Sequence, residues 1–149
     1  MAVIDKINIS EKSDGDTYYK TSIYLEKNKG IQGDRYYNNF KEKKNQVTII
    51  ENEKIENFNN KLNKKIQPKD FRRNLITIGI DLNSLIGKKI KIGTDVILYI
   101  HEICQPCNYL QKKLKVKELV KLLVNKSGVN AEIVNSGIIK QGDEIFILD

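Results

Sequence analysis

Two glycine-centred segments constrain the fold of this chain more than any other feature. Residues 89–98 and residues 138–148 each carry apolar residues on both sides of a glycine, Gly93 in the first and Gly142 in the second. Apolar runs that flank a short glycine turn are typical of antiparallel β-hairpins, because glycine adopts the backbone angles that such turns need. We therefore expect both segments to form hairpins.

Short apolar runs elsewhere predict further strands, and runs with helical spacing predict a few helices. Strands are expected at residues 2–9, 17–25, 46–50, 75–78, 95–99 and 131–134. Helices are expected at residues 51–62 and near 117–123, with a short helix or turn around 81–86. Regular alternation of strand and helix is absent from the pattern, which excludes a doubly wound α/β fold.

The predicted fold class is therefore mainly β (α+β), with one domain that spans residues 1–149. A chain of this length can enclose one hydrophobic core. Antiparallel hairpins dominate the pattern, and a sheet that closes on itself has no exposed edge strands. We expect a partly closed antiparallel β-barrel with two or three short helices at its ends.

The stretch at residues 100–110 concentrates the reactive side chains. It contains both cysteines, Cys104 and Cys107, and the single histidine, His101. Pro106 has no N–H to donate, so strand pairing is expected to end there, and helical spacing follows it. Cys107 is thus expected between a strand and a helix, where backbone N–H groups favour a thiolate.

The residues alone leave four interpretations of this stretch open. Both cysteines can be small core residues, since free cysteine is among the most buried residue types. They can form a thioredoxin-like Cys-x-x-Cys pair, although that fold needs βαβ units before the motif. His101, Cys104 and Cys107 can be zinc ligands, although no second Cys/His pair closes a structural site. Finally, Cys107 can be a single reactive or metal-binding thiol in a basic pocket.

The composition and the first residues of the chain indicate in which cellular compartment the protein is expected. Hydrophobic residues make up 40% of the chain, and no apolar run reaches the length of a membrane span. The first residues lack the charged and apolar regions of a signal peptide. Two cysteines without such a signal suggest a reducing cytosol and no disulfide. We expect a cytoplasmic protein with no membrane partner. We also expect Cys104 to be dispensable.

The net charge of +7 by itself suggests a polyanionic partner. The lysines, however, are spread along the chain in short clusters, and the chain has no tryptophan. Aromatic and basic residues do not interleave as they do in proteins that bind single strands. A solvated lysine surface is the favoured interpretation, and nucleic acid is not an expected partner.

Arginine is used sparingly. Of the 26 basic residues three are arginine, namely Arg35, Arg72 and Arg73, and they fall in two short segments that also hold Gly, Asp or Asn. A guanidinium grips an oxyanion through two parallel N–H bonds, which an ammonium group cannot do. These segments predict an anion-binding pocket. Alternation along an expected strand places Arg73 on the face opposite to Arg72.

An ordered series of motifs resembles the MOSC domain, the module named for the C-terminal part of molybdenum cofactor sulfurases. In chain order the motifs are Gly30-Ile31-Gln32-Gly33-Asp34-Arg35, Gln46-Val47-Thr48, Phe71-Arg72-Arg73-Asn74, Leu85-Ile86-Gly87 with Ile92-Gly93, Pro106-Cys107, Gly128-Val129-Asn130-Ala131 and Ile139-Lys140-Gln141-Gly142-Asp143. Each motif alone is weak, but together their order extends over nearly the whole chain.

The resemblance implies a β-barrel with one essential cysteine, which matches Cys107. That cysteine is expected to carry sulfur as a persulfide, or to bind the molybdenum of molybdenum cofactor (molybdopterin). It is the predicted catalytic residue and, with the cofactor bound, the predicted metal ligand. Tyr36 stands where the family often has histidine. The cofactor-binding residues that the resemblance implies for the same pocket are Gly33, Asp34, Arg35, Arg72 and Asn74.

The function that the resemblance implies is that of a molybdenum-cofactor-associated sulfur carrier, similar to a sulfurtransferase. A cysteine desulfurase or a molybdoenzyme is the implied partner, and metal–sulfur cluster assembly is the implied process. The chain has no room for the pyridoxal-phosphate-dependent half of larger relatives, so its chemistry is expected to be independent of pyridoxal phosphate. The alternative is a non-catalytic module that binds molybdopterin or another small anionic ligand.

Overall fold

The computed structural model describes residues 1–12, 15–40, 42–106 and 108–148 of the chain. The strands of the described residues are β1 (Val3–Ile9), β2 (Tyr18–Lys20), β3 (Ser22–Glu26), β4 (Gly30–Ile31), β5 (Val47–Glu51), β6 (Leu75–Ile78), β7 (Lys89–Ile92), β8 (Val96–Ile103), β9 (Val129–Asn135), β10 (Gly137–Lys140) and β11 (Ile145–Leu148). The α-helices are α1 (Asn52–Leu62), α2 (Asn108–Leu114) and α3 (Leu119–Leu122), and the 3-10 helices are η1 (Lys43–Asn45), η2 (Pro68–Phe71) and η3 (Leu82–Leu85).

The strands form two sheets. The larger sheet has eight strands in the order β11-β7-β8-β9-β5-β6-β1-β2, and the smaller has three in the order β10-β3-β4. The mainly β (α+β) class is thereby confirmed. In the described residues, neither order returns to its first strand, so neither sheet closes into a barrel and the expected partial closure is not supported.

One strand pair departs from the antiparallel pattern. Strands β5 and β6 pair in parallel, with Ile49 opposite Leu75 and Ile50 opposite Ile76. A parallel pair cannot be joined by a tight turn and needs a crossover, which α1 and η2 supply here. The described residues therefore contain one βαβ unit, and the other strand pairs of this sheet are antiparallel.

Two apolar clusters share strands β5 and β6. One cluster lies between the strands of the two sheets and includes Ile49 and Leu75. The other packs under the helices and includes Ile50 and Ile76. Successive side chains of a strand point to opposite faces, so neighbouring residues of β5 and β6 enter different clusters. Burial on both faces is typical of parallel strands that a helix covers.

The segment at residues 138–148 is not a hairpin. Strand β10 pairs with β3 and β11 pairs with β7, so its two halves belong to different sheets. The backbone N–H of Gly142 donates to the carbonyl oxygen of Ile4 at 2.7 Å, and the N–H of Ile4 donates to Asp143 at 2.9 Å. These bonds to β1 occupy the turn and separate the two strands. The segment at residues 89–98 does form the expected hairpin, as β7 and β8.

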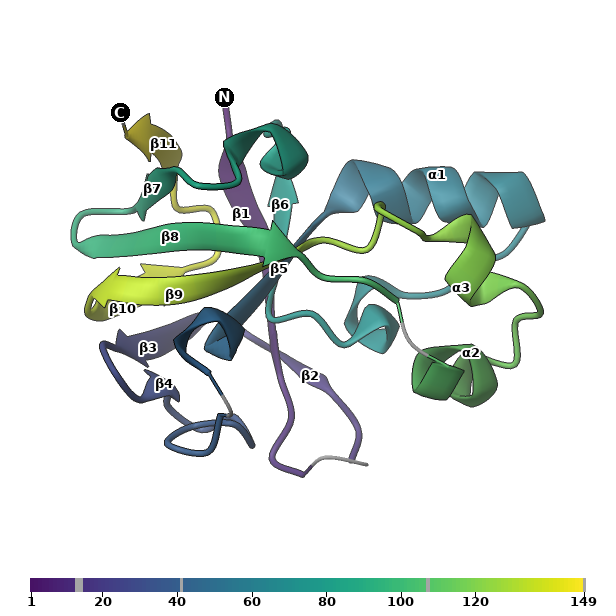
Figure 1. Ribbon diagram of the computed structural model, residues 1–149, viewed down its shortest axis with the longest axis horizontal. Coiled ribbons are helices and arrows are strands. Elements are labelled where there is room, and N and C mark those ends of the chain that lie inside the picture. Colours follow the sequence, from purple (N-terminus) through teal and green to yellow (C-terminus); the bar gives the residue numbers. More distant parts are fainter. Residues whose placement is uncertain (13–14, 41, 107, 149) are drawn as a thin grey trace.

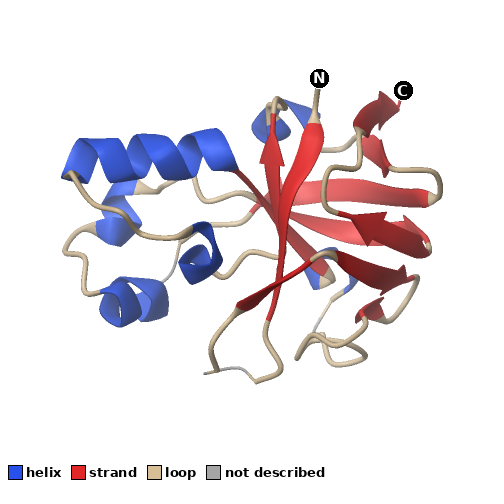
Figure 2. Cartoon of the chain, turned by 180° about the vertical axis from the view of Figure 1, so that it is seen from behind, coloured by secondary structure: helices blue, strands red, loops and turns tan. Residues whose placement is uncertain are grey.

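The α-helices and η2 lie together at one end of the molecule, beside the sheets (Figures 1 and 2). Helices α1, α2 and α3 pack with η2 on the second apolar cluster, and we call residues 52–71 and 108–126 the helical lobe. The expected helical run after Leu110 is divided, because Lys115 and Glu118 take positive φ angles of 55° and 64°. In the described part of the chain, no helix has the length and apolar character needed to span a bilayer.

Candidate functional site

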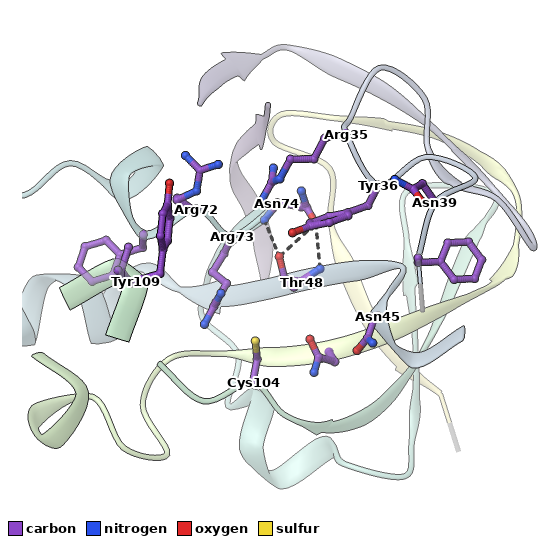
Figure 3. A pocket seen from close by; sticks show the side chains of 14 residues that line it. Arg35, Tyr36, Asn39, Asn45, Thr48, Arg72, Arg73, Asn74, Cys104 and Tyr109 are labelled. Atoms are coloured by element: carbon purple, nitrogen blue, oxygen red, sulfur yellow. Dashed lines mark hydrogen bonds between the residues drawn. The ribbon is translucent and has the colours of Figure 1, made fainter. Parts of the chain in front are cut away.

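A pocket of about 760 Å³ lies where the sheets meet the helical lobe (Figure 3). Its walls come from the loop after β4, from η1, β5 and β9, from the segment before β6, and from the end of β8 with the start of α2. The lining residues are Arg35, Tyr36, Asn39, Phe40, Asn45, Thr48, Phe71, Arg72, Arg73, Asn74, Cys104, Tyr109, Leu110 and Asn130. All three arginines of the chain thus reach one pocket.

Arg35 carries a donor without a partner. Its side chain is 11% exposed, and its Nη1 lies 3.4 Å from Oδ1 of Asp34. The guanidinium carbon lies 4.5 Å from the centre of the Tyr36 ring. In the described residues, the buried Nε has no hydrogen-bond partner. A buried N–H without a partner destabilises the fold, so an acceptor on a ligand would relieve that cost.

Asp34 and Gly33 stand behind this arginine and do not line the pocket, contrary to the prediction that Asp34 does. Oδ1 of Asp34 accepts the backbone N–H of Ser10 at 3.1 Å, and Oδ2 accepts that of Tyr36 at 3.3 Å. Gly33 supplies the loop with a φ of +89°. A carboxylate that accepts backbone N–H groups fixes a loop, so Asp34 holds the loop that carries Arg35.

Arg72 enters the pocket from a strained backbone position. It caps η2 with φ 61° and ψ 29°, in the left-handed region that side chains seldom adopt. Its Nη1 donates to the carbonyl oxygen of Gly15 at 2.7 Å, and its guanidinium carbon lies 6.0 Å from the Tyr109 ring centre. Strain of this kind gathers at functional sites, where the surroundings hold the residue in place.

Arg73 lines the same pocket as Arg72, which the expected alternation of a strand did not predict, although the two side chains extend in different directions (Figure 3). That expectation assumed strand geometry, but Arg72 is left-handed and β6 begins only at Leu75. Arg73 donates through Nε to the carbonyl oxygen of Ser127 at 2.9 Å and through Nη2 to its hydroxyl at 2.7 Å. A longer bond of 3.4 Å joins Nη2 to the carbonyl oxygen of Gln105.

Asn74 and Thr48 join three strands at the pocket (Figure 3). Oδ1 of Asn74 accepts the backbone N–H of Thr48 at 3.0 Å and its hydroxyl at 3.1 Å. Nδ2 of Asn74 donates to the carbonyl oxygen of Asn8 at 3.3 Å. An amide group has two N–H donors, and no second bond from Nδ2 occurs in the described residues. One N–H of Asn74 is thus left without a partner among the described residues.

The segment before the expected reactive thiol is held firmly. The N–H of Cys104 donates to the carbonyl oxygen of Gly128 at 2.8 Å. The side chain of Gln105 donates to Oδ1 of Asn125 at 2.6 Å and accepts its N–H at 2.9 Å. Figure 3 shows the Cys104 sulfur on the pocket wall where Arg73 lies. Cys107 itself lies outside the described residues, so its predicted roles stay predictions.

Eleven of the fourteen lining residues were not predicted as site residues, and four of them illustrate what the sequence could have shown. Cys104 and Tyr109 flank position 107, while Thr48 and Asn130 belong to motifs that carried the resemblance. Membership in those motifs is the signal that could have found Thr48 and Asn130.

The zinc interpretation gains no support from the histidine. His101 does not line the pocket, and its Nε2 lies 2.9 Å from Oε1 of Glu132. Its ring also packs edge-on against Tyr99, with centres 4.6 Å apart. In the described residues, no group of three or more His, Cys, Asp or Glu side chains could hold a metal ion. Since the zinc set includes Cys107, its geometry lies partly outside the described residues.

Comparison with known proteins now adds the family. The model of the MOSC domain family matches residues 28–146. The chain belongs to the MOSC domain family. Among curated proteins, a "Reductase" from Gibberella moniliformis (strain M3125 / FGSC 7600) is 32% identical over 82 residues. That match covers 53% of this MOSC chain but only 15% of the length of the reductase.

Solved structures share the fold. The YuaD protein from Bacillus subtilis has a TM-score of 0.83 at 19% identity, over 99% of this chain and 96% of its own. YiiM from Geobacillus stearothermophilus has a TM-score of 0.82 at 17% identity, over 100% of this chain and 76% of its own. YiiM from Escherichia coli gives 0.76 at 14% identity, over 99% and 70%. At these identities the likeness concerns the fold alone.

Proposed function

We propose that this MOSC domain binds molybdenum cofactor in the pocket and carries sulfur on Cys107. The observation that carries the proposal is the meeting of Arg35, Arg72 and Arg73 in one pocket, beside the segment that leads to Cys107. These arginines lie far apart in the sequence, and lysine is the cation at the other 23 basic positions. Guanidinium groups suit planar and bidentate recognition of phosphate and heterocyclic oxygens.

The pocket residues fit an anionic pterin. Arg35 has a buried Nε with no partner among the described residues, and Asn74 has a second amide N–H. Tyr36 and Tyr109 are 44% and 42% exposed, and each has an arginine over its ring. In this arrangement the guanidinium groups would hold the phosphate and the tyrosine rings would flank the planar pterin. When bound, the cofactor supplies a molybdenum centre that accepts a thiolate or sulfide ligand.

Sulfur transfer through Cys107 is a simple exchange. The Cys107 thiolate attacks the terminal sulfur of a persulfide on a donor such as a cysteine desulfurase. The donor S–S bond breaks as the new S–S bond forms, and the donor cysteine leaves as a thiolate. The exchange requires no outside oxidant or reductant. Cationic surroundings favour the thiolate form that attacks, and this pocket carries three guanidinium groups.

The proposed sulfur carrier and a non-catalytic binding module differ in one test. The module is the second candidate, because the arginines, Asn74 and the tyrosines form an anion site without Cys107. Incubation with a cysteine desulfurase and cysteine should add one sulfur to the intact mass of the wild type and none to Cys107→Ala. Molybdopterin should bind both proteins. Binding without any added sulfur in the wild type would leave the module as the function.

A further inference from the structure

The net charge of the chain resides in the helical lobe. Residues 52–71 and 108–126 hold eleven lysines and four acidic residues, so the lobe accounts for the full net charge of +7. The other 110 residues hold fifteen residues of each sign. Lysines that look dispersed along the chain are thus gathered by the fold at one end, where Figure 1 shows the helices. A field of one sign over one end steers oppositely charged partners towards it.

The lobe lysines are exposed and mostly without counter-ions. Nine of the eleven are exposed, and only Lys54 and Lys69 are half-buried. In the described residues, Lys54 is the one lobe lysine with a carboxylate within ion-pair distance, at 3.1 Å from Oε1 of Glu51. Elsewhere in the molecule lysines do find partners, as Lys44 does with Glu102 at 3.1 Å. The lobe therefore presents a positive surface that carboxylates of the described residues do not neutralise.

A small slot opens in this surface between α1 and α3. Its residues are Lys54, Asn57, Phe58, Lys61, Leu122, Leu123 and Lys126. Phe58 and Leu123 are buried and supply an apolar floor, while the three lysines stand around it. Its volume of about 20 Å³ has room for one small group of about the size of a methyl. The α1 residues of the slot follow i, i+3, i+4, i+7 spacing, so they form one stripe of the helix.

We propose that the helical lobe is a docking surface for an acidic protein segment that places one aliphatic side chain in the α1–α3 slot. The positive charge of the lobe favours an acidic partner, and the apolar floor of the slot favours an aliphatic side chain. This inference does not depend on what the pocket binds. It does bear on access to the pocket, because Tyr109 and Leu110 of α2 belong to both the lobe and the pocket wall.

The chemistry of the lobe favours a protein over a nucleic acid. All eleven cations of the lobe are lysine, whereas base recognition relies on arginine forks and on stacking aromatic rings. The aromatic residue of the slot, Phe58, is 4% exposed and so cannot stack on a base. Tyr109 is exposed but sits at the pocket, with Lys113 Nζ 5.8 Å from its ring centre.

The test uses the full chain and a fluorescent peptide of glutamates with one central leucine, at low salt where surface charges act most strongly. We expect Lys61→Glu with Lys126→Glu to weaken binding by about tenfold or more. The matched control is Lys112→Glu with Lys117→Glu, which changes the charge of the same lobe equally but leaves the slot intact; it should weaken binding less than about threefold. Replacing the leucine of the peptide with serine should weaken binding to the wild type.

Several results would overturn this proposal. Equal losses in the two double variants would mean that the charge acts diffusely and that the slot binds nothing. An absence of peptide binding to the wild type would exclude the docking surface. Tighter binding of duplex DNA or of anionic vesicles, with the same dependence on Lys61 and Lys126, would assign the surface to those partners. Circular dichroism of each variant verifies the fold, and all four substituted lysines are exposed.

Discussion

Arg73 donates a hydrogen bond to each of two acceptors on Ser127. Its Nε donates to the carbonyl oxygen at 2.9 Å, and its Nη2 donates to the hydroxyl at 2.7 Å. Ser127 is 1% exposed, so both acceptors are removed from water and depend on this arginine. The neighbouring Gly128 accepts the N–H of Cys104. Arg73 thus positions the segment that bears the cysteines, although it also borders the pocket.

Replacing Arg73 with lysine should destabilise the protein by about 1–3 kcal/mol, because an ammonium group cannot bond both acceptors and leaves one of them buried without a donor. Urea unfolding measures the loss. Ser127→Ala is the control, since it removes only the hydroxyl acceptor and should cost less. An Arg73→Lys variant as stable as the wild type would show that water replaces the guanidinium.

Arg35→Lys and Arg72→Lys keep the net charge of +7 and so separate geometry from bulk electrostatics. Each should reduce molybdopterin affinity by about tenfold, equivalent to about 1.4 kcal/mol, because lysine offers a point charge and no planar fork. Titration of molybdopterin at fixed salt measures this. Affinities that match the wild type in both variants would place the ligand elsewhere.

Gly128→Ala should be among the most destabilising single substitutions in the chain. Gly128 has a φ of +95°, and an added Cβ would collide with the backbone carbonyl of Ile49. We expect a loss of about 3 kcal/mol or more in the free energy of unfolding, from strain and overpacking together. Gly142→Ala is the matched control, with a φ of +91° and nothing within 4 Å of the added Cβ. Its loss should be about 1 kcal/mol, the cost of left-handed backbone alone.

The contribution of Glu51 to the free energy of unfolding should fall as the pH rises through the range in which its carboxyl group loses its proton. Burial raises the pKa of this carboxyl, and the neighbouring Lys54 offsets only part of that shift. The folded state then binds the proton more tightly than the unfolded state, so the contribution of Glu51 is most favourable below its unfolded pKa and is lost as the pH passes its folded pKa. The unfolding free energy of the wild type relative to Glu51→Gln should therefore decline with rising pH. A difference that grows with pH would contradict this.

Substitutions of the two cysteines should have opposite results in a sulfur-loading assay. Cys107→Ala should abolish the added sulfur seen by intact mass, and Cys104→Ser should retain it. Cys104 lines the pocket wall, so its serine variant also serves as the control for disturbance of that wall. Loss of loading in both variants would revive the interpretation of a Cys-x-x-Cys pair.

Local patterns predicted local elements well. The strand expected at residues 75–78 has the same bounds as β6, and the helix expected at residues 51–62 begins one residue later, as α1. Both follow from apolar spacing within one segment. The second hairpin failed because pairing partners depend on distant residues: the bonds between Gly142 and Ile4 direct β10 and β11 to different sheets.

The candidate site was predictable in part for a similar reason. Residue type and motif order singled out Arg35, Arg72 and Asn74, and the structure brings these three to one pocket. The presence of Arg73 at the pocket was not predictable, because the left-handed residue at position 72 interrupts the alternation of a strand. Likewise, the gathering of lysines in the helical lobe appears only once α1 and α2 lie at the same end of the molecule.

Strands β5 and β6 are buried on both faces, so they connect the pocket to both apolar clusters. Thr48 and Asn74 immediately precede Ile49 and Leu75, which enter the cluster between the sheets, and the next residues along each strand enter the cluster under the helices. The helical lobe therefore packs on the same two strand segments that carry the Thr48–Asn74 hydrogen bonds. The two apolar clusters are thus one residue apart along each strand, and we expect the two halves of the molecule to unfold together rather than separately.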